Sequence, residues 1–159
     1  MFSHIRSAAL GAALVLLATP AWALEVSKSI DLQTSPAQVW KVIGDFCSIA
    51  EWHPVIASCE QSEKGGATYR KLTTTDGGVL VEKLIERSDE AMSYTYTIVE
   101  SPLPVVDYVS TLRVGTQGYG ARVFWSGTFS AEGASDQQAI EVIAGIYQAG
   151  LKGIKELLE

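Results

Sequence analysis

The fold is decided by the stretch SPAQVWKVIGDFCSIAEWHP, residues 35–54. It begins with the pattern of a helix N-terminus: Ser35 can cap the helix, Pro36 fits the first helical position, and Gln38 completes a capping box. Apolar residues then follow at helical spacing as far as Phe46. This pattern predicts a helix that starts after Ser35 and buries one face.

A second short helix is expected at residues 48–52, directly after the first. Gly44 ends or loosens the first helix, and Pro54 disfavours helical backbone at His53, so the chain must turn out there. Asp45 follows Gly44, where it could stabilise the turn or serve as a catalytic group. The stretch therefore predicts two small helices and a forced stop.

Strand patterns surround these helices. Val26, Ile30 and Leu32 alternate with polar residues and predict a first strand at residues 24–34. Beyond Ile56 the period is two, and Gly- and Pro-rich turn signals separate consecutive strands, which predicts an antiparallel meander. The six strands expected in this region are about 55–62, 67–75, 79–87, 92–100, 106–116 and 121–131.

A long helix is the last predicted element. Ser135 and Gln138 form a second capping box, and an apolar stripe follows them. The apolar face of a seven-stranded sheet cannot stay in water, so this helix must cover it. We therefore predict an α+β fold in which a curved antiparallel sheet encloses the C-terminal helix and a cavity, with the two short helices at one end. The stripe is Ile140, Ile143, Tyr147, Leu151, Ile154 and Leu158.

Aromatic residues with polar tips gather on the predicted inner faces of the last three strands. Such a wall suits an amphipathic organic ligand, because the rings give contact area and the hydroxyls give orientation. The alternative is that the rings simply fill a solid core. The residues concerned are Tyr94, Tyr96, Tyr108, Ser110 and Trp125.

Glu82 is the first candidate for a functional charge, provided that its strand places it inside, which the alternation along residues 79–87 does not decide. A buried carboxylate needs a partner or a raised pKa. We interpret Arg70 as a structural partner for a carboxylate on a neighbouring strand. His53 either reaches the cavity mouth or holds the turn before Pro54. The chain has no nucleophile motif and no phosphate-binding loop, so Glu82 with tyrosine hydroxyls as donors is the remaining catalytic candidate.

The first residues have the pattern of a secretory signal. A weakly basic start precedes an apolar run from Ala8 to Ala18, and Ala21 and Ala23 supply small residues for cleavage after Ala23. A membrane anchor is the alternative, but the run is shorter than the roughly 20 apolar residues that a spanning helix needs. We expect residues 1–23 to be removed and residues 24–159 to form one periplasmic or secreted domain.

Charge and cysteine content restrict the partners. The chain has 12 Lys and Arg against 18 Asp and Glu, and an acidic domain is a poor partner for nucleic acid or anionic lipid. In an oxidising compartment Cys47 and Cys59 either form a disulfide or stay as two buried thiols. One histidine beyond the signal cannot build a usual zinc site, so we expect no metal. We also expect no cofactor. No other segment of the sequence could cross a membrane, so we expect no stable membrane insertion after cleavage.

Residues spread over the whole domain give the chain a family resemblance. They are Pro36, Val39, Trp40, Asp45, Phe46, Trp52, His53, Pro54, Gly66, Arg70, Gly77, Gly78, Glu82, Leu84, Tyr94, Tyr96, Leu103, Pro104, Asp107, Tyr108 and Trp125. On these residues the chain resembles the START-like (SRPBCC) superfamily, which has the helix-grip fold of the birch-pollen allergen, lipid-transfer START domains and polyketide cyclases. It resembles in particular the bacterial polyketide cyclase/dehydratase and lipid-transport group. This superfamily includes binders, transporters and enzymes.

Residues 106–111 and Glu82 are similar to the plant abscisic-acid receptors. That resemblance implies that Glu82, Tyr108 and Ser110 face the cavity and touch a ligand or its waters. It also implies a gate loop after the third strand and a latch loop after the fifth. The gate residues would be Asp76, Gly77 and Gly78, and the latch residues Pro102, Leu103 and Pro104.

Three functions are therefore considered. The first is an exported, cofactor-free domain that binds a small hydrophobic, aromatic or amphipathic molecule. The second is an acid–base enzyme of the cyclase/dehydratase type with Glu82 as its catalytic residue. The third is a periplasmic accessory protein with a protein partner, because the chain also resembles exported accessory proteins of bacterial methanol oxidation. The candidate ligand-binding residues are Trp52, His53, Glu82, Tyr94, Tyr96, Tyr108, Ser110, Trp125, Ile143 and Tyr147.

Overall fold

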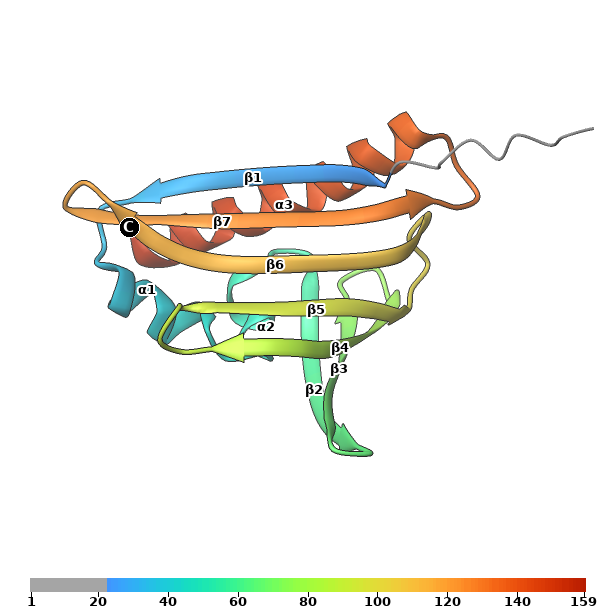
Figure 1. The fold of residues 1–159 in the computed structure, drawn as a ribbon, viewed down its shortest axis with the longest axis horizontal. Coiled ribbons are helices and arrows are strands. Elements are labelled where there is room, and N and C mark those ends of the chain that lie inside the picture. The colour runs from blue at the N-terminus through green and yellow to red at the C-terminus, as the bar shows by residue number, and fades with distance from the viewer. Residues whose placement is uncertain (1–22) are drawn as a thin grey trace, which may run out of the picture.

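The computed structural model describes residues 23–159, which form one curved sheet around a long helix (Figure 1). The predicted signal segment lies outside the described residues, apart from Ala23. No helix within residues 23–159 is long and apolar enough to cross a membrane. The elements are β1 (Leu24–Leu32), α1 (Pro36–Ile43), α2 (Ile49–Trp52), β2 (Ile56–Lys64), β3 (Ala67–Thr74), β4 (Val79–Ser88), β5 (Ser93–Glu100), β6 (Val105–Gln117), β7 (Gly120–Ala131) and α3 (Asp136–Leu158).

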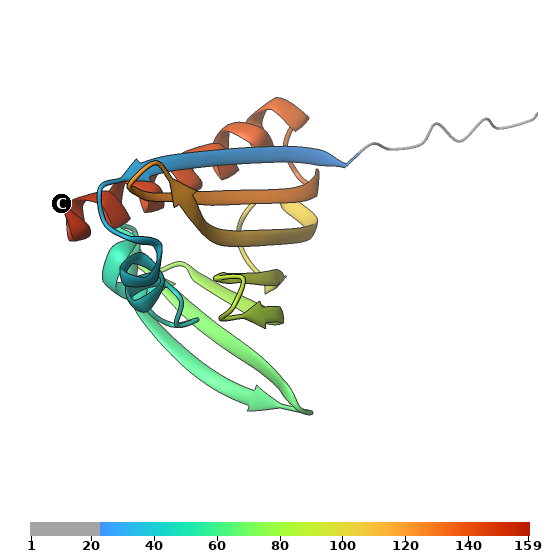
Figure 2. The same ribbon diagram turned by 60° about the vertical axis from the view of Figure 1, so that its left-hand side comes forward.

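The seven strands form a single antiparallel sheet in the order β1-β7-β6-β5-β4-β3-β2. Strands β2 to β7 follow one another as a meander, and β1 joins the far edge by pairing with β7. Figure 1 shows α3 running behind β1 and β7, and Figure 2 shows β2 and β3 projecting as a hairpin away from that helix. The predicted helix-grip architecture and all of its elements are confirmed.

Inward-facing residues alternate along the strands as the sequence predicts. On β5 and β6 the buried set includes Tyr94, Tyr96, Tyr108 and Ser110. On β4, where the alternation left the face undecided, Glu82 is the inward residue and is 5 % exposed. The core therefore lies between these inner faces and α3, and it contains a charged side chain.

Two glycines allow α3 to lie close against the rest of the fold. A Cβ atom at Gly150 would lie 2.6 Å from the ring of Trp125 and 2.7 Å from the ring of His53. A Cβ atom at Gly153 would overlap the carbonyl oxygen of Trp52. The end of α2 and the buried tryptophan of β7 thus contact the helix backbone directly, which closes one end of the core.

One of the two predicted capping boxes is present. At α3, Ser135 Oγ accepts the Gln138 N–H at 3.2 Å, and the Gln138 side chain accepts the Ser135 N–H at 3.0 Å. The box predicted at α1 is wrong, because Ser35 Oγ donates to the Gln38 side-chain oxygen at 2.8 Å and caps no backbone N–H. Side-chain pairing outcompetes the backbone at this exposed position.

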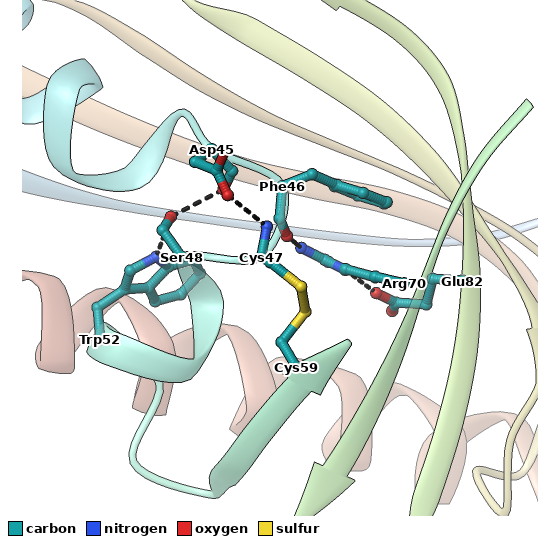
Figure 3. Close-up of a disulfide and its surroundings, with 8 residues drawn as sticks. All are labelled: Asp45, Phe46, Cys47, Ser48, Trp52, Cys59, Arg70 and Glu82. Atoms are coloured by element: carbon teal, nitrogen blue, oxygen red, sulfur yellow. Dashed lines mark hydrogen bonds and ion pairs between the residues drawn. A yellow bond between two sulfur atoms is a disulfide. The ribbon is translucent and has the colours of Figure 1, made fainter. Parts of the chain in front are cut away.

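The connection between α1 and α2 is fastened to β2 by a disulfide (Figure 3). Cys47 and Cys59 are bonded, with their Cα atoms 5.5 Å apart, so of the two predicted states the structure has the disulfide. Asp45 Oδ1 accepts the Cys47 N–H at 2.9 Å, and the Asp45 carbonyl accepts the Ser48 hydroxyl at 2.8 Å. Asp45 therefore occupies a turn-stabilising position beside the disulfide.

Candidate ligand-binding cavity

A cavity of about 370 Å³ lies between the inner face of the sheet, the α2–β2 connection and α3. Sites for small organic molecules generally occupy roughly 300–1,000 Å³, so this volume falls within their range. Most of the wall is aliphatic or aromatic. The lining residues are Ile49, His53, Val55, Ile56, Leu72, Thr74, Thr75, Asp76, Leu80, Glu82, Tyr96, Ile98, Leu103, Tyr108, Trp125, Val142, Ile143 and Ile146.

The cavity brings together only part of the predicted ligand-binding set. His53, Glu82, Tyr96, Tyr108, Trp125 and Ile143 line it. Trp52, Tyr94, Ser110 and Tyr147 are buried but are not part of the wall, so they can act only through the residues in front of them. Of the gate and latch residues, Asp76 and Leu103 line the cavity, whereas Gly77, Gly78, Pro102 and Pro104 do not.

The exposed lining residues mark the mouth of the cavity. Val55 from the α2–β2 connection is 41 % exposed and Val142 from α3 is 38 % exposed. Asp76, on the β3–β4 turn, also lines the cavity. Its Oδ1 accepts hydrogen bonds from the Thr74 hydroxyl and the Gly78 N–H. The Thr74 hydroxyl, the principal donor, lowers the pKa of Asp76. The predicted gate turn is therefore braced by its own side chains at the rim.

Glu82 is held by an ion pair at the inner end of the cavity. It stands directly opposite Arg70 in the β3–β4 register, and Arg70 Nε donates to Glu82 Oε2 at 2.6 Å. This confirms the predicted pairing of Arg70 with a carboxylate on a neighbouring strand. Glu82 lines the cavity but Arg70 does not, so the cation lies behind the carboxylate. An ion pair of this kind makes a carboxylate tolerable in an apolar interior.

Arg70 is fully buried and is surrounded by aromatic rings. Its guanidinium carbon lies 4.0 Å from the centre of the Phe46 ring and 4.8 Å from that of Tyr96. Arg70 Nη1 donates to the Phe46 carbonyl, next to the disulfide (Figure 3). Burial is the largest single influence and opposes the charge on Arg70, but Glu82, Tyr94 and Tyr96 together outweigh it and raise the pKa of the guanidinium. Arg70 thus joins the disulfide-bearing connection to the charged end of the cavity.

A chain of hydroxyl groups lies behind the aromatic wall. Ser110 Oγ lies 2.8 Å from the Ser126 carbonyl and 2.9 Å from the Tyr147 hydroxyl. Tyr147 in turn lies 2.7 Å from the Tyr108 hydroxyl, which is 3.5 Å from that of Tyr96. Because Tyr96 and Tyr108 line the cavity, this chain connects the cavity surface to the backbone of β7.

Trp125 connects the same groups from the other side. Its Nε1 lies 3.1 Å from both the Tyr96 hydroxyl and Ser110 Oγ. Its ring stacks on that of Tyr147, with centroids 4.6 Å apart and an angle of 11° between the planes. Gly127 leaves room for the Tyr147 hydroxyl, which a Cβ atom there would overlap. The aromatic wall is therefore fixed in position by hydrogen bonds as well as by packing.

Burial sets the protonation of the polar groups in the wall. It raises the pKa of Tyr96 and of Tyr108 well above the usual value of 10, and that of Tyr147 to about 12. Burial also lowers the pKa of His53 to about 4. Near neutral pH the tyrosines are therefore protonated donors and His53 is uncharged.

His53 lies between α2 and α3 at the cavity wall. Its Nε2 is 3.0 Å from the Ile146 carbonyl, and its Nδ1 is 3.4 Å from the Val55 N–H. A carbonyl can only accept, so Nε2 bears the proton and Nδ1 accepts from the backbone. Of the two predicted roles, His53 has the structural one, because it fixes the turn after α2. It also borders the cavity, but as a buried wall residue that is 3 % exposed rather than at the mouth.

The cavity also contains residues that the sequence did not single out. Most are aliphatic groups on β2 to β5 and on α3, and nothing in their type distinguishes them from core residues. No group of three His, Cys, Asp or Glu side chains within residues 23–159 could hold a metal ion.

The fold and cavity define a START-like (SRPBCC) protein of the helix-grip type. Over residues 23–159 the chain matches the polyketide cyclase/dehydrase and lipid transport family, and it belongs to that family. The lipid transport in the description of this family associates it with small hydrophobic molecules.

Several solved structures are similar to this chain. XoxI from Bacillus cereus is 37 % identical, with a TM-score of 0.79 over 84 % of this chain and 94 % of its own. A protein from Bacillus thuringiensis is also 37 % identical, with a TM-score of 0.79 over 85 % of this chain and 98 % of its own. The Zhui aromatase/cyclase from Streptomyces sp. R1128 is 15 % identical, with a TM-score of 0.70 over 86 % of this chain and 94 % of its own, which is a likeness of fold alone.

Proposed function

We propose that this protein is an exported, cofactor-free binding protein that holds a small hydrophobic or amphipathic molecule in the cavity between the sheet and α3. The observation that supports this most directly is the cavity itself, of about 370 Å³, with a mostly apolar wall and a few polar groups. Sites for small organic ligands have this combination, because apolar area gives affinity and the few polar groups give orientation.

Binding fits the protonation of the site better than acid–base catalysis does. A general acid or base works best with a pKa near the operating pH. In this wall the pKa of His53 is lowered to about 4, and those of Tyr96 and Tyr108 are raised well above 10. The protonation state of these groups does not change near neutral pH. They therefore suit the role of fixed hydrogen-bond donors and acceptors for a ligand. Glu82 is paired with Arg70 and is the one side chain on which the catalytic alternative depends.

Export is supported by two features of the chain. The first residues have the basic start, apolar run and small-residue cleavage pattern of a secretory signal. The Cys47–Cys59 disulfide is of a kind that persists in oxidising compartments. Expression with the natural N-terminus, followed by fractionation and intact mass with and without reductant, would test both. We expect a periplasmic chain that begins at Leu24 and gains the mass of two hydrogen atoms when the reductant converts the disulfide to two thiols.

Ligand binding is tested by native mass spectrometry and thermal shift against a library of lipids and aromatic compounds. At least one apolar compound should bind one-to-one and raise the melting temperature. Val142→Trp should weaken binding, because Val142 lines the mouth and is 38 % exposed, so an indole there obstructs the cavity without overpacking the core. Leu157→Trp, on the same helix and 50 % exposed, is the matched control because Leu157 does not line this cavity. If no compound binds, or if both variants weaken binding equally, the proposal fails.

A further inference from the structure

The hydroxyl chain behind the cavity has a fixed direction. Each hydroxyl has one proton, and the Ser126 carbonyl can only accept, so Ser110 donates to it across 2.8 Å. Ser110 has then used its proton, so Tyr147 must donate in the 2.9 Å contact with Ser110. Tyr147 has in turn used its proton, so Tyr108 must donate to Tyr147 across 2.7 Å. From Tyr108 onward, each hydroxyl therefore donates toward the backbone of β7.

Tyr96 is the head of this chain, and its proton has no good acceptor among the described residues. The Tyr108 oxygen is 3.5 Å away, whereas O–H···O hydrogen bonds are generally about 2.5–3.0 Å long. Trp125 Nε1 can only donate to the Tyr96 oxygen, so it cannot take the proton. Because Tyr96 lines the cavity, its O–H is a donor available to a ligand there.

Glu82 supplies an acceptor beside this donor. Its Oε2 accepts from Arg70, while Oε1 makes no hydrogen bond with any described residue. Glu82 lies opposite Ile98 on β5, and Leu84 lies opposite Tyr96, so Glu82 and Tyr96 are diagonal neighbours on the inner face. Such neighbours are about 7–8 Å apart at the backbone and within reach of long side chains. A single ligand atom between them can contact both.

Arg70 does not make the region around Glu82 a binding site for anions. Its charge is compensated by Glu82, and it lies behind the carboxylate rather than in the wall. A ligand carboxylate placed there would meet the Glu82 charge first, in an apolar cavity where like charges repel strongly. Arg70 is therefore a positioning residue: it orients Glu82 and lies 4.8 Å from the ring centre of Tyr96.

We infer that the cavity selects a neutral apolar molecule with one hydroxyl head group. The hydroxyl donates to Glu82 Oε1 and accepts from the Tyr96 O–H, while the apolar body occupies the aliphatic part of the cavity. This inference rests on the proposed binding function and adds the chemical class of the ligand. It excludes carboxylates as preferred ligands and distinguishes alcohols and phenols from their ethers.

The test uses four probes with one common body: naphthalene, 2-naphthol, 2-methoxynaphthalene and 2-naphthoate, titrated by calorimetry at pH 7. Naphthol can donate and accept, the ether can only accept, and naphthoate is an anion. A hydrogen bond to a charged group increases affinity about tenfold or more. A hydrogen bond between neutral groups increases it a few-fold. We expect naphthol to bind about tenfold more tightly than the ether, and naphthoate to bind most weakly.

Variants assign the two contacts. Glu82→Gln should bring the naphthol-to-ether affinity ratio close to one. Tyr96→Phe should reduce the ether-to-naphthalene ratio several-fold, and it keeps the fold because Trp125 Nε1 still has Ser110 as acceptor. The fully exposed Tyr119 provides the control, since Tyr119→Phe should leave both ratios as they are.

The outcomes separate this inference from the proposed function. If all four probes bind wild-type protein equally, or if naphthoate binds best, the hydroxyl inference is overturned while cavity binding stands. If Tyr108→Phe reduces the ether-to-naphthalene ratio more than Tyr96→Phe does, the direction of the hydroxyl chain is wrong. If neither these probes nor any library compound binds, both the proposed function and the inference are overturned.

Discussion

Acidification should destabilise this protein through His53 before it affects the carboxylates. Burial lowers the pKa of His53 to about 4 in the folded state, against an ordinary value of 6.5 in the unfolded chain. Between these values the unfolded chain binds a proton that the folded protein does not bind. The contribution of uncharged His53 to the free energy of unfolding is therefore fully present above pH 6.5, and it is lost progressively as the pH decreases toward 4.

The size of the effect follows from the difference between the two pKa values. A shift from 6.5 to about 4 corresponds to about 3 kcal/mol once the pH is below both values. Between pH 7 and pH 5 the loss is about 2 kcal/mol, from the same linkage relation. Carboxylates with lowered pKa, such as Asp31 and Asp76, have ordinary values of 3.8 and lose their contribution only at lower pH. The interval from pH 7 to pH 5 therefore reports on His53.

Urea denaturation at pH 7 and pH 5 measures the effect, with His53→Gln as the comparison. The glutamine amide can donate to the Ile146 carbonyl in place of Nε2, and it does not titrate. Wild-type protein should lose about 2 kcal/mol between the two pH values, and the variant should lose little. An equal loss in both proteins, or an imidazole that titrates near pH 6.5 in the folded state by NMR, would refute the reasoning.

The remaining predictions concern the disulfide, the glycines of α3 and the buried ion pair. Replacing Cys47 and Cys59 by serine should cost about 3 kcal/mol in chemical denaturation, as the chain-entropy relation gives for so short a loop; equal stability of wild-type protein with and without reductant would contradict this. Gly150→Ala should cost about 1–3 kcal/mol through overpacking. A Cβ atom at Gly145, on the same helix, would meet open space, so Gly145→Ala should instead raise the free energy of unfolding by roughly 0.5–1 kcal/mol. If both variants change stability in the same direction, the packing argument is contradicted. Arg70→Met should cost about 3–5 kcal/mol in thermal or urea unfolding, because it leaves a buried carboxylate unpaired, and a cost below 1 kcal/mol would show that the pair is dispensable.

The fold could be predicted from sequence because each element has a local signal. Helix caps, period-two alternation and glycine turns identify the elements, and short connections between strands leave the meander as the simple topology. The exception was Ser35, where residue type alone could not tell a backbone cap from the side-chain contact with Gln38 that the structure has. Local patterns specify where elements lie better than they specify individual hydrogen bonds.

The site was predicted less completely, because a cavity depends on which core positions leave space. Alternation identified Tyr96 and Trp125 as inward, but the same pattern holds for Tyr94, which is buried outside the cavity wall. The alternation on β4 was ambiguous for Glu82, although the turn at Asp76 fixes the register that places it opposite Arg70. The packing of distant elements, rather than residue type, decides which inward residues border the cavity.

The β2–β3 hairpin divides the protein into regions of different opening free energy. Along β2 only Ile56 is buried, and the strand is exposed from Glu60 to its end, whereas at the base of β3 Arg70 and Leu72 are buried. Backbone hydrogen bonds near solvent open at low cost, so amides at the projecting tip should exchange with deuterium rapidly. Protection should begin at Arg70. The ion pair thus lies at the border between a hairpin that opens locally and a core that exchanges only by global unfolding, and a ligand on Glu82 should extend slow exchange toward the tip.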